Sequence, residues 1–571
     1  MKPTLVFRAR LLCALFIVVA LLLVLRLYLV QIVHGEAYTR DANSQYVESG
    51  AETADRGTIY FTTKDGSLVA AAAMQSGWRI AIKPADIQDA GRTYRAIASS
   101  TPIDAERFNT AVAKTHDPYE EVAFRVSDEA ADTIRGAKMP GVILVRDKWR
   151  TYPGGTLAAQ AIGFVGFRGN DRAGIYGLER QWESTLAAER GGLYVNPFAE
   201  IFTNVEALIT DDPAGFAGSI ITTIEPSVQA NLEKTLEKVM STYSPRATGG
   251  IIMDPKTGDI VAIAGRPAYD PNTYNTVADP SVYTNVLVEG RYELGSIMKP
   301  LTVAIAIDSG ALTPETTYND TGCITRSTKK ICNFDSKARG IVSVQQVLSQ
   351  SLNVGAAFVG DRAGHDTLTK YMKAFGFGAR TGIDLPGEVS GDISPLGDGD
   401  SPEVNYAAAA FGQGISVTPI GMTRALASLG NDGKMPQPHI VSAIRYDSGI
   451  TRTIEAQEPI TVLSPETAHT VSRMLAEVFD KGLLGGDLKK ERYSIAAKTG
   501  TAQIAKPGGG YYEDRYLHSF FGYFPAHEPR FIVFLLALEP KGVQYASASL
   551  AHPFADITDF LINYYDIPPD R

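Results

Sequence analysis

The segment Glu293-Leu-Gly-Ser-Ile-Met-Lys299, with the apolar residues that follow it, is the most informative stretch of this 571-residue sequence. Gly295 permits a tight entry, and the apolar pattern to Ser309 predicts a buried helix beginning at Ser296. Ser296 and Lys299 are three residues apart and therefore share one helix face. The free N–H groups and partial positive charge of a helix N-terminus favour an alkoxide or an oxyanion at Ser296.

A lysine acts as a base only if it is neutral in part. Lowering the pKa of Lys299 from about 10.4 to near 7 requires roughly 4–5 kcal/mol. A helix terminus supplies at most about 2 kcal/mol. We therefore expect burial and a second cation near Lys299, and Lys498 is the candidate for that cation.

Two more motifs follow in the chain, Ser351-Leu-Asn353 and Lys498-Thr-Gly-Thr501. Ser351 is suited to a proton relay, and the Asn353 amide offers a donor and an acceptor to a peptide backbone. The third motif has the pattern of a strand, in which Gly500 lets another backbone approach closely. A peptide can pair along such a strand, while the hydroxyls of Thr499 and Thr501 can hold a terminal carboxylate.

Other matches to these motifs are less suited to chemistry. Ser327-Thr-Lys-Lys330 is polar and begins no apolar helix, and Lys256-Thr-Gly258 is predicted to be a hairpin turn. The sequence has no Gly-rich phosphate loop ending in Gly-Lys-Ser/Thr, no His-Glu-x-x-His and no Gly-x-Ser-x-Gly. The three motifs together therefore predict acyl transfer through a serine ester, without a cofactor.

Two of the three cysteines, Cys323 and Cys332, lie close together in the sequence. A disulfide between them is possible on the exported side of a membrane, and it would contribute roughly 2–3 kcal/mol in the chain-entropy model. Two reduced structural thiols are an equally open alternative. Because no histidine pair lies near them, we expect no zinc and no other metal site.

The N-terminus predicts a membrane anchor at residues 11–33, where Arg26 interrupts an otherwise apolar stretch. Basic residues within positions 1–10 place that short segment in the cytoplasm and the rest of the chain outside the cytoplasmic (inner) membrane, in single-pass topology. A cleaved signal peptide is the alternative. The net charge of −9 argues against nucleic acid as a partner.

The exported part is predicted to be an α+β protein. Residues 34–218 combine strands, short helices and many turns, as in a pedestal domain without catalytic residues. Residues 219–571 have strand patterns at both ends and helical patterns between them, which predicts an antiparallel sheet flanked by helices plus an all-helical subdomain. The expected strands are 221–225, 250–253, 260–263, 494–504, 519–524 and 531–538.

With these motifs and domains, the sequence resembles the class B penicillin-binding proteins, with the septal, division-specific type favoured. The three motifs carry the resemblance, together with 150–179, 223–229, 254–267 and Phe411-Gly-Gln-Gly-Ile-Ser-Val-Thr-Pro419. Leu294 departs from the proline that many relatives have before Gly-Ser.

The resemblance implies a peptidoglycan D,D-transpeptidase. Ser296 would attack D-Ala-D-Ala of a stem peptide, Lys299 would take its proton, and the N–H groups of Ser296 and Thr501 would form the oxyanion hole. β-Lactams would acylate Ser296. No glycosyltransferase domain is expected, so a membrane-embedded glycan polymerase and other division or elongation proteins would be partners. An elongation-type enzyme, a D,D-carboxypeptidase or β-lactam sensor, and a non-catalytic scaffold remain alternatives.

Overall fold

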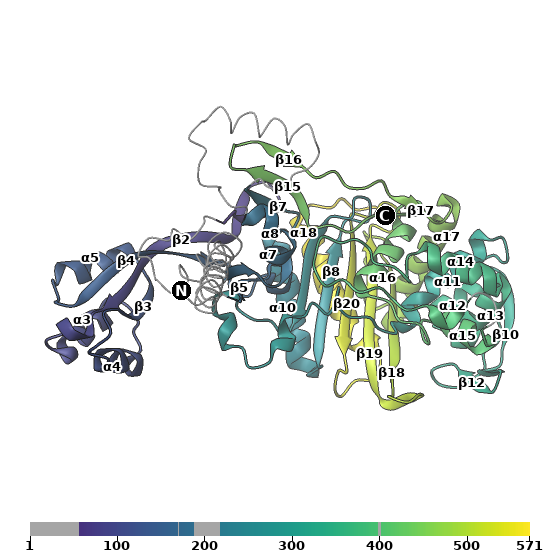
Figure 1. The fold of residues 1–571 in the computed structure, drawn as a ribbon. Helices are drawn as coiled ribbons and strands as arrows, with labels where there is room; N and C mark the ends of the chain where they lie inside the picture. Colours follow the sequence, from purple (N-terminus) through teal and green to yellow (C-terminus); the bar gives the residue numbers. More distant parts are fainter. Residues whose placement is uncertain (1–55, 170, 188–216, 398–400) are drawn as a thin grey trace, which may run out of the picture. The chain divides into compact units, whose positions relative to one another are not determined.

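The computed structural model describes residues 56–169, 171–187, 217–397 and 401–571, which belong to two compact units (Figure 1). Of the described residues, the first unit holds Gln75–Trp149, Gly169 and Asp171, and the second holds the rest. The predicted anchor at 11–33 and cytoplasmic segment at 1–10 lie outside the described residues. Within those that are described, we find no helix with the length and apolarity needed to cross a membrane.

The first unit is built from strands and short helices, as the sequence predicts. Each α-helix starts where a side chain accepts a hydrogen bond from a free N–H group: Asp89 caps α3, Asp104 caps α4 and Ser127 caps α5. The apolar faces of these helices bury Ile97, Phe108 and other residues against the strands. Its elements are the later part of β2 (Leu68–Ile82), α3 (Ala90–Ala98), α4 (Ala105–Ala113), β3 (Glu120–Val126), α5 (Asp128–Gly136) and most of β4 (Val142–Thr151).

A five-stranded antiparallel sheet forms the centre of the second unit, which confirms the predicted sheet. Its strand order is β18-β19-β20-β8-β9, so β18 lies at one edge. The tight turn at 254–258 joins β8 to β9, also as predicted. The strands are β8 (Ala247–Met253), β9 (Ile260–Arg266), β18 (Ala496–Ala505), β19 (Tyr511–Phe524) and β20 (Phe531–Leu538).

Strand β20 shows why this sheet is covered on both faces. All of its side chains are apolar and buried. Because successive side chains point to opposite faces of a strand, alternate residues enter two separate hydrophobic clusters: Phe534 belongs to one and Leu535 to the other. A strand buried between two helical layers therefore needs an uninterrupted apolar run, with no alternation of polar and apolar residues.

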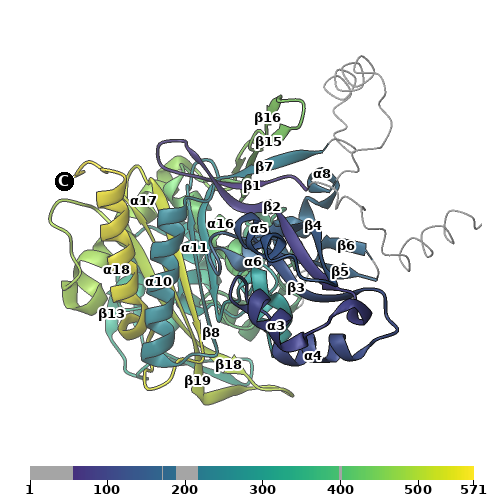
Figure 2. The same cartoon turned by 90° about the vertical axis from the view of Figure 1, so that its left-hand side faces the viewer.

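Helices α10 (Pro226–Tyr243) and α18 (Ala546–Tyr564) lie side by side on one face of the sheet (Figure 2). The other layer includes α11 (Lys299–Asp308), α16 (Pro419–Ala427) and α17 (Pro465–Glu477). A helical region adjoins it, visible beyond β18 in Figure 1. Its helices are α12 (Val344–Ser349), α13 (Asn353–Ala363), α14 (His365–Ala374) and α15 (Glu403–Ala409).

Long-range strand pairing makes the second unit discontinuous in sequence. Strand β7 (Gly218–Thr222) pairs in parallel with β1 (Ile59–Thr62) and antiparallel with β15 (Val441–Tyr446). β15 in turn pairs with β16 (Thr451–Thr453). The division of the sequence into domains at 218/219 stays a prediction.

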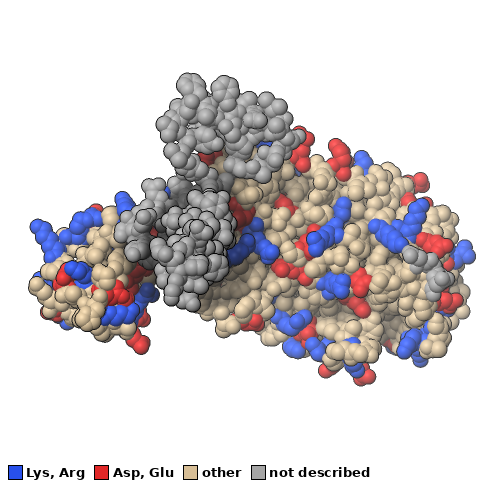
Figure 3. All heavy atoms as spheres, in the orientation of Figure 1, with Lys and Arg blue, Asp and Glu red and all other residues tan. Residues whose placement is uncertain are grey.

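Smaller elements complete the described chain. Basic and acidic side chains are interspersed on the face shown in Figure 3. Short helical segments are α6 (Ala159–Ile162), α7 (Gly177–Gln181), α8 (Glu183–Leu186), η2 (Pro84–Asp86), η3 (Pro271–Thr276), η4 (Pro280–Tyr283), η6 (Ser394–Leu396), η7 (Ser428–Gly430), η8 (Val478–Gly482) and η9 (Leu483–Gly486). Short strands are β5 (Val165–Arg168), β6 (Asp171–Gly174), β10 (Thr317–Asp320), β11 (Cys323–Arg326), β12 (Lys329–Cys332), β13 (Gly340–Ser343), β14 (Lys434–Met435) and β17 (Ile460–Thr461).

Candidate active site

Ser296 lies in a single turn of 3-10 helix, η5 (Gly295–Met298), which leads into α11. The prediction that the α-helix itself begins at Ser296 is therefore wrong by three residues. The reason is Pro300, which has no N–H group to donate to the carbonyl of Ser296. The backbone N–H of Lys299 donates to that carbonyl instead. In a 3-10 turn, residues three apart eclipse each other, so Ser296 and Lys299 still lie on one side.

Two glycines let η5 pack directly on strand β18. Gly295 has φ +65°, and a Cβ there would lie 3.1 Å from the carbonyl carbon and oxygen of Thr501. A Cβ on Gly500 would lie 2.6 Å from the carbonyl oxygen of Leu294. Both positions therefore require glycine. The first and third motifs are in backbone contact, and Ser296 remains half-buried beside the strand.

Lys299 joins the first motif to the second. It is completely buried, and its Nζ donates to the carbonyl oxygen of Ser351 at 2.5 Å and to Asn353 Oδ1 at 2.9 Å. Ser351 Oγ lies 3.2 Å from the same nitrogen. Burial, with the positive charge of Lys498, lowers the pKa of Lys299 well below its usual 10.5. The amine is thus in reach of a relay hydroxyl and suited to accept a proton.

Lys498 supplies the second cation that the sequence calls for. Its side chain is 3% exposed, and its Nζ donates to the carbonyl of the neighbouring Thr499 at 3.1 Å. Burial lowers the pKa of Lys498 to about 7. A full positive charge on both buried amines would cost free energy, because each charge is removed from water and the two charges repel each other.

The second motif occupies a turn between α12 and α13. Ser351 has left-handed backbone geometry, with φ 54°, and Asn353 is the first residue of α13. The Asn353 amide is already partly used, because Nδ2 donates to the carbonyl of Cys332 at 3.0 Å. One N–H of that group and one lone pair of Oδ1 remain for a substrate.

The two threonines of the third motif have different environments. Thr501 Oγ1 accepts a hydrogen bond from Ala546 N–H at 3.0 Å, at the start of α18. Its hydroxyl proton therefore remains available for a carboxylate. Thr499 is half-buried on the edge strand β18, where an extended peptide can pair. The roles of both threonines and of the Ser296 and Thr501 N–H groups stay predictions.

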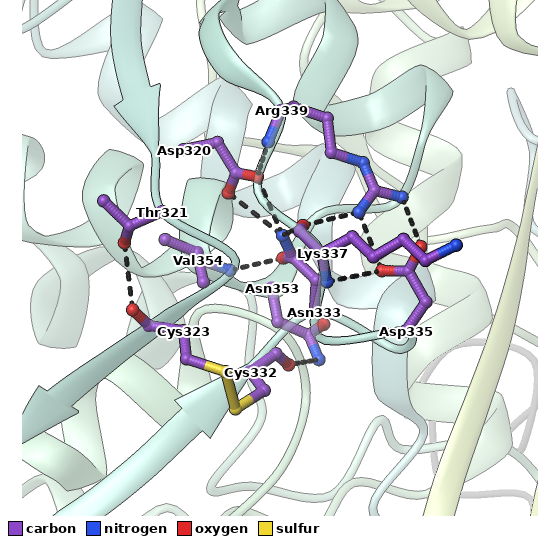
Figure 4. Close-up of a disulfide and its surroundings, with 10 residues drawn as sticks. All are labelled: Asp320, Thr321, Cys323, Cys332, Asn333, Asp335, Lys337, Arg339, Asn353 and Val354. Carbon is purple, nitrogen blue, oxygen red and sulfur yellow. Dashed lines mark hydrogen bonds and ion pairs between the residues drawn. A yellow bond between two sulfur atoms is a disulfide. The ribbon is translucent and has the colours of Figure 1, made fainter.

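Cys323 and Cys332 are joined by a disulfide that closes the hairpin β11–β12 (Figure 4). Nothing in the sequence indicated that this hairpin contacts the second motif. The sequence also did not point to Asn333, which accepts from Val354 N–H next to Asn353, or to Asp320, which accepts from Asn333. Neither residue belongs to a motif or to a periodic pattern. Their polar side chains in a segment next to a cysteine were the available signal.

Comparisons with known proteins agree with this geometry. Residues 248–559 match the family described as penicillin binding protein transpeptidase domain, and residues 51–200 match the penicillin-binding protein dimerisation domain. Stage V sporulation protein D of Bacillus subtilis is 30% identical over 546 residues, which cover 94% of this chain and 82% of that protein.

Peptidoglycan D,D-transpeptidase FtsI of Escherichia coli is 25% identical over 579 residues, covering 99% of this chain and 93% of the relative. A crystal structure of penicillin-binding protein 3 from Mycobacterium tuberculosis, complexed with aztreonam, superposes with a TM-score of 0.69 at 22% identity. It covers 91% of this chain and 98% of that one, and so shows the same fold. The chain belongs to the penicillin-binding proteins, as a class B member with a dimerisation domain and a transpeptidase domain.

Proposed function

We propose that this protein is a serine-type peptidoglycan D,D-transpeptidase that cross-links the septal cell wall. The observation that carries the proposal is the position of Lys299. It is buried and hydrogen-bonded to Ser351 and Asn353, and its pKa is lowered by burial and by the positive charge of Lys498. The E. coli relative, named peptidoglycan D,D-transpeptidase FtsI, supports the substrate and the reaction.

In the first half-reaction, Ser296 Oγ attacks the carbonyl carbon of the D-Ala-D-Ala peptide bond, and its proton passes to Lys299. The carbonyl oxygen gains negative charge, which the N–H groups of Ser296 and Thr501 stabilise. The C–N bond then breaks. The proton travels through Ser351 to the leaving amine of D-Ala, and an acyl ester remains on Ser296.

In the second half-reaction, an amine of a neighbouring stem peptide attacks the ester. The new C–N bond forms, the C–O bond breaks, and Ser296 recovers a proton from the attacking amine through Lys299. Lys498 keeps the electrostatic field positive in both half-reactions, and Asn353 and the edge of β18 hold the donor peptide. Thr499 and Thr501 hold the terminal carboxylate in the first half-reaction, until it leaves with D-Ala. A β-lactam enters the same path, but its opened ring stays attached and blocks the second step.

We also propose that residues 11–33 anchor the chain in the cytoplasmic membrane, with the catalytic unit outside. The uncharged stretch from Leu11 to Leu25 and the basic residues before it support this. A membrane-embedded glycan polymerase would then supply the strands to be cross-linked. A fluorescent fusion should concentrate at the division septum; a side-wall pattern would favour an elongation role instead.

The nucleophile is tested by acylation with a fluorescent penicillin. Wild-type protein should be labelled and Ser296→Ala should not, while the two keep the same melting temperature. Equal labelling of both proteins would refute the assignment of Ser296. Incubation with polymerised glycan strands should give cross-linked dimers. Tetrapeptide and free D-Ala without dimers would identify a carboxypeptidase, and no turnover at all would identify a scaffold.

A further inference from the structure

Helix α13, which begins at Asn353, lacks a cap of its own. The residue before it, Leu352, has no side-chain acceptor for the free N–H groups of the first turn. Asn333 supplies one from a distant part of the chain: its Oδ1 accepts from the buried Val354 N–H at 3.1 Å. The start of the helix that carries Asn353 is therefore fixed by a side chain 21 residues earlier.

Asp320 fixes which way the Asn333 amide points (Figure 4). Both carboxylate oxygens of the fully buried Asp320 accept from Asn333 Nδ2 at 3.0 Å. The same carboxylate accepts from Arg339 N–H at 2.9 Å and from the Tyr318 hydroxyl at 3.3 Å. Because an ionised carboxylate only accepts hydrogen bonds, Nδ2 of Asn333 must face Asp320 and Oδ1 must face Val354.

The same segment also sets the orientation of the Asn353 amide. The carbonyl of Cys332, next to Asn333, accepts from Asn353 Nδ2 at 3.0 Å. With the donor end held there, Oδ1 is turned toward Lys299, at 2.9 Å from its Nζ. A flipped amide would place two oxygens together at Cys332 and two donors together at Lys299.

Arg339 holds the motif from its other side. Its guanidinium Nε donates to Oε1 of Gln350, the residue before Ser351, at 3.2 Å. The guanidinium is itself held by Asp335 through two hydrogen bonds, at 2.7 and 3.0 Å. The segment 332–339 thus contacts Asn353 and the two residues that flank the second motif, Gln350 and Val354.

We infer that Asp320, Asn333 and Arg339 are positioning residues for acylation. They hold the Ser351–Asn353 turn so that the side-chain oxygen Oδ1 of Asn353 faces Lys299. The inference rests on the proposed function of Ser296 and Lys299. None of the three side chains needs to touch the substrate. They act through Asn353, and through it on the amine that accepts the proton.

Asn333→Asp is the variant that tests the assembly, because it sets a second carboxylate against Asp320. We expect the acylation rate constant for a fluorescent penicillin to fall about tenfold or more, since a hydrogen bond to a charged group is lost. The affinity of the preceding non-covalent complex should change little. The double variant Asp320→Asn/Asn333→Asp exchanges the two groups, restores a donor and an acceptor between positions 320 and 333 and should recover most of the rate; the contact of Asn333 Nδ2 with the Lys337 carbonyl, at 3.4 Å, is not restored.

A pH profile separates positioning from a general loss of stability. Lys498 on β18 is the charged group whose positive charge lowers the pKa of Lys299. If Asn353 Oδ1 no longer faces Lys299, the charged form of that amine loses an acceptor, and the acid limb of the acylation profile should move to lower pH. The double variant should return the limb to its wild-type position.

Arg339→Ala is the second variant, which removes the contact with Gln350 and leaves the Arg339 N–H in place. It should also slow acylation without changing affinity. Thr321→Ala is the matched control: the exposed Thr321 hydroxyl donates to the carbonyl of Cys323 in the same hairpin and does not contact the motif. Its acylation rate and pH profile should equal those of the wild type.

Wild-type rates and pH profiles in both Asn333→Asp and Arg339→Ala would overturn the inference. So would a slow Asn333→Asp protein that the double variant fails to rescue. If Asn333→Asp does not fold, the acylation rates and pH profiles of the double variant and of Arg339→Ala still test the inference. These outcomes presuppose that wild-type protein is labelled at Ser296; an unlabelled wild type would refute the proposed function instead.

Discussion

Lys299 donates a hydrogen bond of 2.5 Å to the carbonyl of Ser351, a residue whose backbone is left-handed. That conformation costs a residue other than glycine about 1–2 kcal/mol, so it persists only where the surroundings impose it. Lys299 therefore has a structural role as well as a chemical one. It is part of what folds the second motif, and changes at either residue should be felt at the other.

The first prediction concerns the pH dependence of acylation. Lys299 accepts a proton only when neutral, and its pKa is lowered by burial and by Lys498, whose own pKa falls to about 7. The two amines titrate as a coupled pair. We expect the acylation rate constant, measured by time-resolved labelling with a fluorescent penicillin, to fall as the pH decreases through the lowered pKa values of this pair.

Variants of Lys498 test the coupling directly. Lys498→Met removes the positive neighbour, so the pKa of Lys299 should rise and the midpoint of the profile should move to higher pH. Lys498→Arg keeps the charge and is the control, with a midpoint near that of the wild type. Equal midpoints in the two variants would contradict a Coulombic effect of Lys498 on Lys299.

The second prediction is that Lys498 lowers stability. In the unfolded chain this lysine binds a proton up to about pH 10.4, whereas in the folded state its pKa is about 7. Between these values the unfolded state holds more protons, so the free energy of unfolding rises with pH, by about 1.4 kcal/mol per pH unit. Below pH 7 the cost of the buried charge is present in full.

Lys498→Met should therefore be more stable than the wild type at pH 6, and this difference should shrink between pH 7 and 10. Urea denaturation of both proteins at pH 6, 8 and 9.5 measures it. A difference that does not vary with pH would show that Lys498 is not neutralised in the folded state. The expected gain illustrates a site that is kept at the expense of stability.

The third prediction concerns the contact between β18 and η5. In Gly500→Ala, the new methyl group would lie 2.3 Å from Ser519 Oγ and 2.6 Å from the backbone oxygen of Leu294. A backbone atom cannot turn away as a flexible side chain can. We expect about 1–3 kcal/mol of destabilisation and a loss of acylation larger than the loss of folded protein, because Ser296 is displaced.

Gly136→Ala is the matched control for this substitution. Gly136 ends α5, and a Cβ there would meet no atom within 4 Å. Its acylation rate and melting temperature should stay close to the wild-type values. If Gly500→Ala were acylated at the wild-type rate, close packing of the two motifs would not be a requirement of the chemistry.

The fourth prediction concerns a buried ion cluster far from the motifs in sequence. Glu179 is completely buried and accepts from Arg56 Nε at 2.6 Å and from Arg150 Nε at 2.7 Å. Glu179→Gln removes the shared counter-charge of two buried guanidinium groups, of which Arg56 keeps an ion pair with Glu183 at 2.6 Å. It should lower the free energy of unfolding by roughly 3–5 kcal/mol, as measured by chemical denaturation.

An exposed ion pair provides the comparison. Asp566 pairs with Lys64 at 2.8 Å, and its side chain is 83% exposed. Asp566→Asn makes the same change from acid to amide and should cost less than about 1 kcal/mol. Similar losses in the two variants would show that burial of Glu179 does not control its contribution.

Much of the second unit could be predicted from the sequence because its patterns are local. The segments 531–538 and 260–263 were predicted to be strands, and they form β20 and part of β9. Pro300 carried a local signal as well, but its consequence was overlooked: without its N–H group, the turn at Ser296 closes as a 3-10 helix.

By itself, the sequence determined the chemical groups and the periods of the elements that carry them: a serine three residues before a lysine, a serine before an asparagine, and a lysine in a strand. These depend on neighbours in the chain. Only the tertiary structure decided that Lys299 is completely buried with a lowered pKa, that β15 pairs with β7, and that Asn333 caps α13. Burial, Coulombic fields and hydrogen bonds between distant segments arise from the packing of the whole unit, and no local pattern encodes them.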